Sequence, residues 1–168
     1  MSTARPTAST LTSAPSGTRV AVVAARFNAD IVQRLTDSCL KRLASLDVTQ
    51  TQLVHVPGAF ELPSACAMLA RTRKFDAIIA LGCVIRGDTP HFEYVAGSCA
   101  SGLMQLGVIE AMPVIFGVLT VNTHEQAVAR AGGEHGEVHG AVHGDAGISA
   151  AEAAVEMVLL RKGIGDRR

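Results

Sequence analysis

Four short apolar runs, each followed by a stretch with helical spacing, constrain the fold of this chain more than any other feature. The runs are residues 20–25, 51–56, 77–85 and 114–119, and the helical patterns follow at 31–46, 59–71, 92–112 and 123–131. Short apolar runs bounded by Gly, Pro or Asn are typical of buried strands. A fifth helical pattern runs from Ser149 to about Lys162.

Residues at the ends of these patterns indicate where the helices begin and stop. We expect Asn28 to cap the first helix, Thr123 or Asn122 to cap the fourth, and Ser149 to cap the last. Pro113 is expected to end the third helix, because proline cannot continue one.

Strands and helices that alternate in this way predict a parallel sheet. Continuous apolar strands indicate a sheet covered on both faces, and right-handed crossovers place the helices there. We therefore predict an α/β fold, a three-layer α/β/α sandwich around a four-stranded parallel sheet, of the flavodoxin-like type. Residues 18–168 are expected to form one domain, since no internal boundary is visible.

Composition argues against several classes of protein. Fifteen basic and fifteen acidic residues give no net charge, whereas a nucleic-acid binder normally shows a basic stripe. A chain without net charge also has little protection against self-association. No stretch is long and apolar enough to span a membrane. Residues 1–17 are rich in Ser, Thr, Ala and Pro, lack the apolar core of a secretory signal, and are expected to be a disordered tail.

The four cysteines, Cys39, Cys66, Cys83 and Cys99, lie far apart in apolar surroundings and form no CxxC pair. Disulfides are rare in the reducing cytosol, where free cysteines are commonly buried. We therefore expect reduced core thiols in a cytoplasmic protein.

Three predicted strands end in polar or aromatic loops, at residues 26–28, 57–61 and 86–91. The carboxyl ends of parallel strands meet at one edge of a sheet, where ligands bind. Together these loops offer an aromatic face, a carboxylate, an imidazole, a hydroxyl and the amides of helix starts. This set suits a small polar ligand with a flat ring and a phosphate.

Each candidate side chain also has a structural interpretation. Phe27 either stacks on a planar heterocycle or packs at a helix entry. Glu61 either binds hydroxyl groups or is an acid favoured by the first turn of a helix. Arg130 either binds a phosphate through two parallel hydrogen bonds or is a cation at a helix end. Thr89 and nearby amides could bind phosphate, and His91 is either solvated or a proton carrier near neutral pH.

Three histidines recur every fourth residue in GEHGEVHGAVHGD, and they are His135, His139 and His143. The glycines between them disfavour a stable helix. A flexible or subunit-contact loop is the favoured interpretation of residues 132–147, and metal binding is the alternative.

Six stretches together resemble one known family. They are ARFN at 25–28, VPGAFELP at 56–63, DAIIALGCVIRGDTPHFEYV at 76–95, PVIFGVLT at 113–120, EQAVARAG at 125–132 and AAVEM at 153–157. Their order and spacing are similar to those of the lumazine synthases, enzymes of the penultimate step of riboflavin biosynthesis. VPGAFELP and VIRGxTxHFEYV are the most specific of these motifs.

The resemblance implies a transferase with two small-molecule substrates. The family condenses 5-amino-6-(D-ribitylamino)uracil with 3,4-dihydroxy-2-butanone 4-phosphate. The products are 6,7-dimethyl-8-ribityllumazine, phosphate and water. The resemblance implies no metal and no organic cofactor.

The family motifs also imply roles at the ring and ribityl end of the site. Phe27 is expected to stack on the pyrimidine ring, with Val84 and Ile85 alongside it. The residues expected to hold the ribityl chain are Ala59, Phe60 and Glu61.

At the other end, His91 is expected to be the proton shuttle and Arg130 the charged partner of the phosphate. The residues expected beside the phosphate are Gly87, Asp88 and Thr89. Phe116 matches a residue that the family supplies from the neighbouring subunit, so the site is expected to lie between subunits.

The chain departs from the family pattern after Gly132. Many members carry a GTKAGNKG-like run with two lysines there, whereas this chain has the longer GEHGEVHGAVHGDAG without lysine. Any role of those lysines is therefore not carried over. Longer insertions at this place accompany free pentamers rather than sixty-subunit shells, so a homopentamer is expected. The resemblance also allows riboflavin synthase as a partner.

Two other classes of function remain open at this point. One is a non-catalytic homologue that binds flavin or lumazine, and the presence of Phe27, His91 and Arg130 favours the enzyme over it. The other, based on fold alone, is a flavodoxin-like electron carrier or phosphate binder. That class needs a Gly- or Thr-rich phosphate loop after the first strand, where this chain has Arg26-Phe27-Asn28.

Overall fold

A four-stranded parallel sheet forms the middle layer of the computed structural model, which describes residues 11, 13–132, 137–138, 141–142 and 144–165. The strands are β1 (Arg19–Ala25), β2 (Gln50–Val56), β3 (Ala77–Ile85) and β4 (Val114–Val121). Their order is β2-β1-β3-β4, and every pair is parallel.

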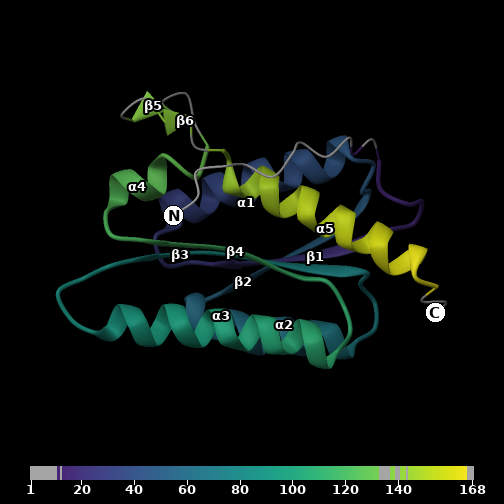
Figure 1. Ribbon diagram of the computed structural model, residues 1–168, viewed down its shortest axis with the longest axis horizontal. Coiled ribbons are helices and arrows are strands. Elements are labelled where there is room, and N and C mark those ends of the chain that lie inside the picture. Colours follow the sequence, from purple (N-terminus) through teal and green to yellow (C-terminus); the bar gives the residue numbers. More distant parts are fainter. Residues whose placement is uncertain (1–10, 12, 133–136, 139–140, 143, 166–168) are drawn as a thin grey trace.

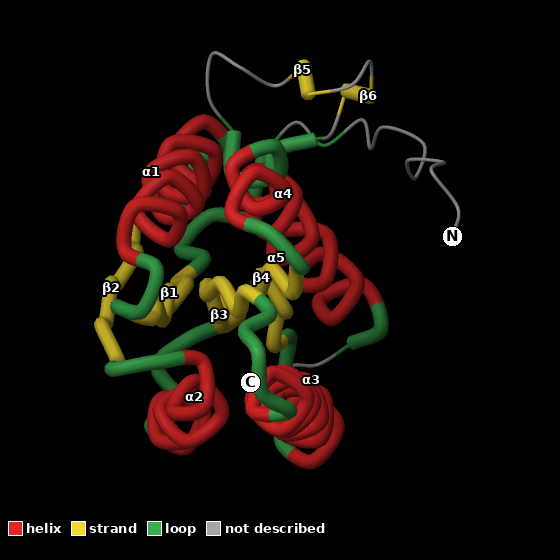
Figure 2. The backbone as a smooth tube through the Cα atoms, turned by 90° about the vertical axis from the view of Figure 1, so that its left-hand side faces the viewer, coloured by secondary structure: helices red, strands yellow, loops and turns green. Residues whose placement is uncertain are grey.

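Helices cover both faces of this sheet (Figures 1 and 2). Helices α1 (Ala29–Ser45) and α5 (Ala146–Gly163) lie on one face. Helices α2 (Leu62–Arg71) and α3 (His91–Ile109) lie on the other. The short helix α4 (His124–Val128) follows β4. The predicted three-layer α/β/α sandwich around a four-stranded parallel sheet is therefore confirmed.

Strand β1 shows why the sheet has two covered faces. Its residues Val20 to Ala25 are all buried, and successive side chains point to opposite sides. Val20, Val22 and Ala24 join the core beneath α1 and α5. The alternate residues Ala21, Val23 and Ala25 join the core above α2 and α3. An unbroken apolar run in the sequence thus fills two separate cores.

The strand register makes β3 project beyond β1 at the carboxyl edge. Leu81 pairs with Ala24 near the end of β1, whereas β3 continues alongside β4 until Ile85 meets Val121. The last residues of β3 and the loop after it therefore extend past the end of β1.

Several predicted boundaries were wrong, for local reasons. Helix α3 ends at Ile109 rather than at Pro113, because Ala111 takes a left-handed backbone (φ 47°). Helix α5 begins at Ala146 and is capped by Asp145, whose Oδ1 accepts from the N–H groups of the two residues Gly147 (2.8 Å) and Ile148 (3.1 Å). Ser149, the predicted cap, lies inside that helix.

Other predicted helix starts are partly confirmed. Helix α1 begins directly after Asn28, but the Asn28 side chain does not cap it. Thr123 caps α4, and its Oγ1 accepts from Gln126 N–H at 3.3 Å. The predicted helix at 59–71 divides into a 3₁₀ turn (Ala59–Glu61) and α2.

The segment that connects α4 to α5 begins and ends at two residues whose backbones are hydrogen-bonded to each other. Ala146 N–H donates to the carbonyl of Arg130 at 2.9 Å. Gly132 has a left-handed backbone (φ 71°), and any Cβ there would collide with the carboxylate of Asp145. Between these ends lie two short antiparallel strands, β5 (Glu137–Val138) and β6 (Ala141–Val142), which the sequence interpretation missed.

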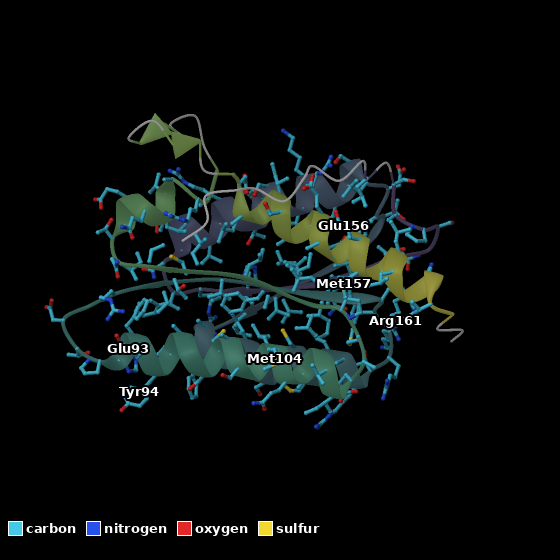
Figure 3. The ribbon with its side chains drawn as sticks, viewed as in Figure 1. Glu93, Tyr94, Met104, Glu156, Met157 and Arg161 are labelled. Atoms are coloured by element: carbon cyan, nitrogen blue, oxygen red, sulfur yellow. The ribbon has the colours of Figure 1, made fainter. Side chains whose placement is uncertain are left out.

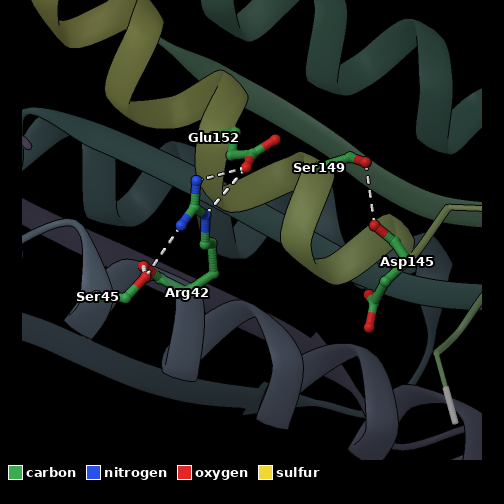
Figure 4. A network of polar contacts seen from close by, with 5 residues as sticks. All are labelled: Arg42, Ser45, Asp145, Ser149 and Glu152. Carbon is green, nitrogen blue, oxygen red and sulfur yellow. Dashed lines mark hydrogen bonds and ion pairs between the residues drawn. The ribbon is translucent and has the colours of Figure 1, made fainter. Parts of the chain in front are cut away.

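Polar contacts between side chains tie α1 to α5, and Figure 4 shows the one between Arg42 and Glu152. Ser38 Oγ donates to Asp145 at 2.8 Å, and Arg42 pairs with Glu152 at 2.7 Å. The two helices on this face are therefore joined by side chains as well as by their common core.

Some predictions concern residues outside the described part of the chain. These residues include 1–10 and 12 of the predicted tail and His135, His139 and His143 of the glycine-rich run. Within the tail segment that is described, Ala14 is buried and its N–H donates to the carbonyl of Leu46 at 2.7 Å. No described helix has the length and hydropathy of a membrane span.

Candidate active site

A cavity of about 550 Å³ opens at the carboxyl edge of the sheet. It lies among the loops after β1, β2 and β3 and the first turns of α3. The residues that line it are Phe27, Asn28, Gly58, Ala59, Phe60, Glu61, Cys83, Val84, Ile85, Gly87, Thr89, His91, Phe92, Tyr94 and Val95. The prediction that these three loops meet at one edge is confirmed.

The loop after β1 is fixed by Asn28. Its side-chain amide donates to the carbonyl of Cys83 at 2.9 Å, and its backbone is left-handed (φ 56°). Asparagine tolerates this conformation better than most residues. The adjacent ring of Phe27 is 73% exposed at the cavity. Phe27 therefore does not pack at the helix entry and is available for stacking.

The loop after β2 presents a carboxylate in a defined position. Glu61 Oε2 accepts from Gly58 N–H at 2.9 Å, across the 3₁₀ turn. A Cβ on Gly58 would lie 3.3 Å from that oxygen, so glycine allows the close approach. Glu61 thus has the structural role that the sequence suggested, and it still lines the cavity. Phe60 beside it is 59% exposed.

The end of β3 and the start of α3 complete the cavity. Val84 and Ile85 are half-buried at the projecting end of the strand, and Gly87 and Thr89 follow in the loop. Helix α3 then starts at His91, and no side chain caps its first turn. Free N–H groups at a helix start favour a bound anion.

Three predicted site residues lie outside this cavity. Asp88 is exposed in the loop but does not line it. Phe116 lies in the middle of β4 opposite Ala80, well before the carboxyl edge, and is 44% exposed. Arg130 follows α4, and its Nη1 donates to the carbonyl of Gln126 at 3.0 Å. Arg130 is thus placed as a cation at a helix end.

Sequence reasoning missed several residues of the lining. Tyr94 and Val95 lie three and four positions after His91, on the same side of α3; Figure 3 labels Tyr94 on this helix, next to Glu93. That helical spacing could have revealed them. Asn28 was interpreted only as a cap, and Cys83 only as a core residue. Nothing in the sequence predicts the bond between Asn28 and Cys83, which depends on how two distant strands meet.

Aromatic side chains gather at this cavity. The whole chain has five Phe and one Tyr, and Phe27, Phe60, Phe92 and Tyr94 all line it. Flat rings offer large contact areas to planar heterocycles. The cavity therefore suits a ligand with an aromatic ring.

The ionisable groups of the cavity differ in what they can do. Burial raises the pKa of the Cys83 thiol to about 11, so it is neutral at physiological pH and a poor nucleophile. His91 and Glu61 are exposed at the cavity, so a ligand can contact both. In the described residues, no three His, Cys, Asp or Glu side chains come together as a metal site.

A family model described as 6,7-dimethyl-8-ribityllumazine synthase matches residues 17–162. The chain belongs to this family. Among known lumazine synthases, one from Thermus thermophilus is 45% identical over 150 residues, which are 88% of this chain and 90% of that protein. One from Salinibacter ruber is 43% identical over 146 residues, 86% of this chain and 88% of that protein. The resemblance seen in the motifs is therefore confirmed.

Proposed function

We propose that this chain is a 6,7-dimethyl-8-ribityllumazine synthase. It condenses 5-amino-6-(D-ribitylamino)uracil with 3,4-dihydroxy-2-butanone 4-phosphate and releases phosphate and water. The observation that carries the proposal is that the family match and the geometry of the site agree. The family match covers most of the chain, and every predicted site residue except Asp88, Phe116 and Arg130 lines one cavity.

The ring of the uracil substrate lies against Phe27, with Val84 and Ile85 alongside. The ribityl chain follows residues 59–61, where Glu61 accepts hydrogen bonds from its hydroxyls. Exposed rings next to a fixed carboxylate support this placement. Holding two substrates in one orientation can supply a large part of the rate enhancement.

The phosphate of the second substrate lies at Gly87, Asp88, Thr89 and the first turn of α3, and Arg130, from outside the cavity, is its charged partner. The uncapped start of that helix supports this placement. Schiff-base formation, phosphate elimination and ring closure each require proton transfers. His91 at the cavity wall performs them, because imidazole can both accept and donate a proton near neutral pH.

The enzyme assembles with copies of itself, as a cytoplasmic homopentamer in which Phe116 covers the site of a neighbour. Exposed apolar side chains on α3 support self-association: Met104, Val108 and Ile109 are each more than 60% exposed. Phe116 is on β4, an edge strand, and is 44% exposed, so a second subunit can reach it. Riboflavin synthase, which would use the product, is the proposed partner.

The experiment mixes the purified protein with both substrates and follows the absorbance of the lumazine product and the release of phosphate. Equal amounts of both products, formed only when both substrates are present, are the expected result. Binding of lumazine or flavin without turnover would show that the protein is a non-catalytic binder and not an enzyme. Sedimentation of the same preparation distinguishes a pentamer from a larger shell.

A further inference from the structure

Arg86 holds the loop between β3 and α3, although it does not line the cavity. Its Nε donates to Asn122 Oδ1 at 3.1 Å, and its Nη1 forms an ion pair with Glu93. The guanidinium also lies 4.3 Å above the centre of the Phe92 ring. One side chain therefore joins the end of β4 to the first turn of α3.

A chain of hydrogen bonds continues from Asn122 to Arg130. Asn122 N–H donates to Gln126 Oε1 at 2.9 Å. Arg130 Nη1 in turn donates to the carbonyl of Gln126 at 3.0 Å. Arg86 and Arg130, which lie far apart in sequence, are thus connected through two residues of the β4–α4 segment.

These contacts explain little of the folding stability. The side chains of Arg86 and Glu93 are 44% and 53% exposed, and exposed ion pairs contribute little to stability. Their effect on geometry is larger, because the residues next to them are the ones that line the cavity. Gly87 follows Arg86 directly, and His91 and Phe92 precede Glu93.

We propose that Arg86 is a positioning residue that aligns the phosphate-binding loop and the first turn of α3 with Arg130. The proposal rests on the proposed function. Arg86 acts through Glu93 and Phe92 on one side and through Asn122 and Gln126 on the other. It sets the distance between the two halves of the phosphate site without touching the substrate.

The chemistry of the side chain explains why arginine is needed. A guanidinium can donate in two directions within its plane while its face covers an aromatic ring. A lysine at this place could pair with Glu93 but could not hold Asn122 and cover Phe92 at the same time. Arg86→Lys should therefore restore only part of the function that Arg86→Gln loses.

The first test compares the variants Arg86→Gln, Arg86→Lys, Glu93→Gln and Asn122→Ala with the wild type. Arg86→Gln should raise the KM for the butanone phosphate roughly tenfold, the scale expected for lost hydrogen bonds to a charged group. The KM for the uracil substrate and the melting temperature should change little. Arg86→Lys should give an intermediate KM, and Glu93→Gln and Asn122→Ala should shift it in the same direction.

Arg42→Gln is the matched control, because Arg42 also forms an arginine–glutamate ion pair, with Glu152 (Figure 4). That pair joins α1 to α5 and does not line the cavity. Arg42→Gln should leave both KM values unchanged. Equal rises of both KM values in Arg86→Gln, or an unchanged KM for the phosphate substrate, would overturn the proposal.

A double-mutant cycle with Arg130→Ala tests the connection itself. If Arg86 acts by aligning Arg130, the double variant should lose less than the product of the two single losses. Multiplicative losses would overturn the proposal. So would a loss in Arg86→Gln alone with normal Glu93→Gln and Asn122→Ala, since Arg86 would then contact substrate directly. Wild-type turnover, measured first, decides the proposed function separately from these comparisons.

Discussion

At the scale of single residues, His91 combines a reactive group with a fixed backbone. It is the first residue of α3 and lies at the cavity wall. His91→Ala should lower kcat by roughly ten- to a thousandfold, because the proposed general acid–base group is lost. The KM values should change less than kcat, since the binding residues remain. Steady-state kinetics, with the melting temperature as a folding control, measure this, and unchanged turnover would contradict the role.

Burial determines the reactivity of the four cysteines. Burial raises the pKa of Cys39 and Cys66 to about 12 and that of Cys83 and Cys99 to about 11. Few thiolates therefore exist near neutral pH, and the thiolate is the reactive form. We expect iodoacetamide to label all four cysteines in urea but hardly any in the native protein. Mass spectrometry checks this, and rapid native labelling of Cys83 would show a reactive thiol in the cavity.

At the scale of secondary-structure elements, the N-terminus of α5 depends on Asp145. This carboxylate accepts from the N–H groups of Gly147 and Ile148 and from Ser38 Oγ. Asp145→Ala should lower the free energy of unfolding by about 1–2 kcal/mol, as expected for loss of a helix cap. Ser149→Ala is the comparison, because Ser149 Oγ only donates to the carbonyl of Asp145. Urea unfolding of both variants measures the difference, and an equal loss in Ser149→Ala would contradict it.

A second element-scale contact joins the start of α1 to α4. His124 Nε2 lies 2.8 Å from Asp30 Oδ2, and this hydrogen bond holds the pKa of Asp30 below its usual value of 3.8. A lowered carboxyl pKa stabilises the fold above pH 3.8, and the contribution disappears as the pH falls through the lower, folded-state pKa. Because both side chains are about half exposed, the contribution is at most about 1 kcal/mol.

We therefore expect His124→Ala to be slightly less stable than the wild type at neutral pH. The difference should shrink as the pH falls below 3.8, because the unfolded state then gains the proton first. Unfolding curves of both proteins along a pH series test this. A difference that grows as the pH falls below 3.8 would contradict the assignment of the pair.

The elements also show how far sequence patterns reach. The strands Arg19–Ala25 and Ala77–Ile85 were predictable almost to the residue, because short apolar runs bounded by polar or turn residues are typical of buried strands. Helix ends were less predictable. Asp145 caps α5 through the N–H groups of Gly147 and Ile148. It was missed because it lies in a run dominated by Gly and His, and its bond with Ser38 of α1 has no signal in the sequence.

At the scale of the whole molecule, the position of Phe116 requires a second subunit if the ring belongs to a substrate site. Phe116→Ala and His91→Ala should each be at least about tenfold less active than the wild type. When equal amounts are unfolded together and refolded, random assembly puts an intact Phe116 beside an intact His91 in about one quarter of sites. We expect about that fraction of wild-type activity in the mixture. Each variant refolded alone is the control, and no recovery in the mixture would place both residues in the same subunit's site.

The candidate site was predictable where it depends on single strand ends and unpredictable where it depends on distances between elements. Phe27, Glu61 and His91 each follow a recognisable strand, so the sheet brings them together. The contacts of Arg86 with Asn122 and Glu93 depend on the relative position of β4 and α3. No local pattern encodes that position, so Arg86 was seen only as part of a motif.

The segment between Arg130 and Ala146 is a candidate place for inserting foreign peptides into this enzyme. Because the two ends are already joined by a hydrogen bond, a longer graft adds only a slowly growing entropic cost to folding. The same bond involves the backbone of Arg130. If Arg130 binds the substrate phosphate as proposed, a graft that breaks this bond should lower enzyme activity before it unfolds the protein. Activity would then report whether the protein tolerates the inserted peptide.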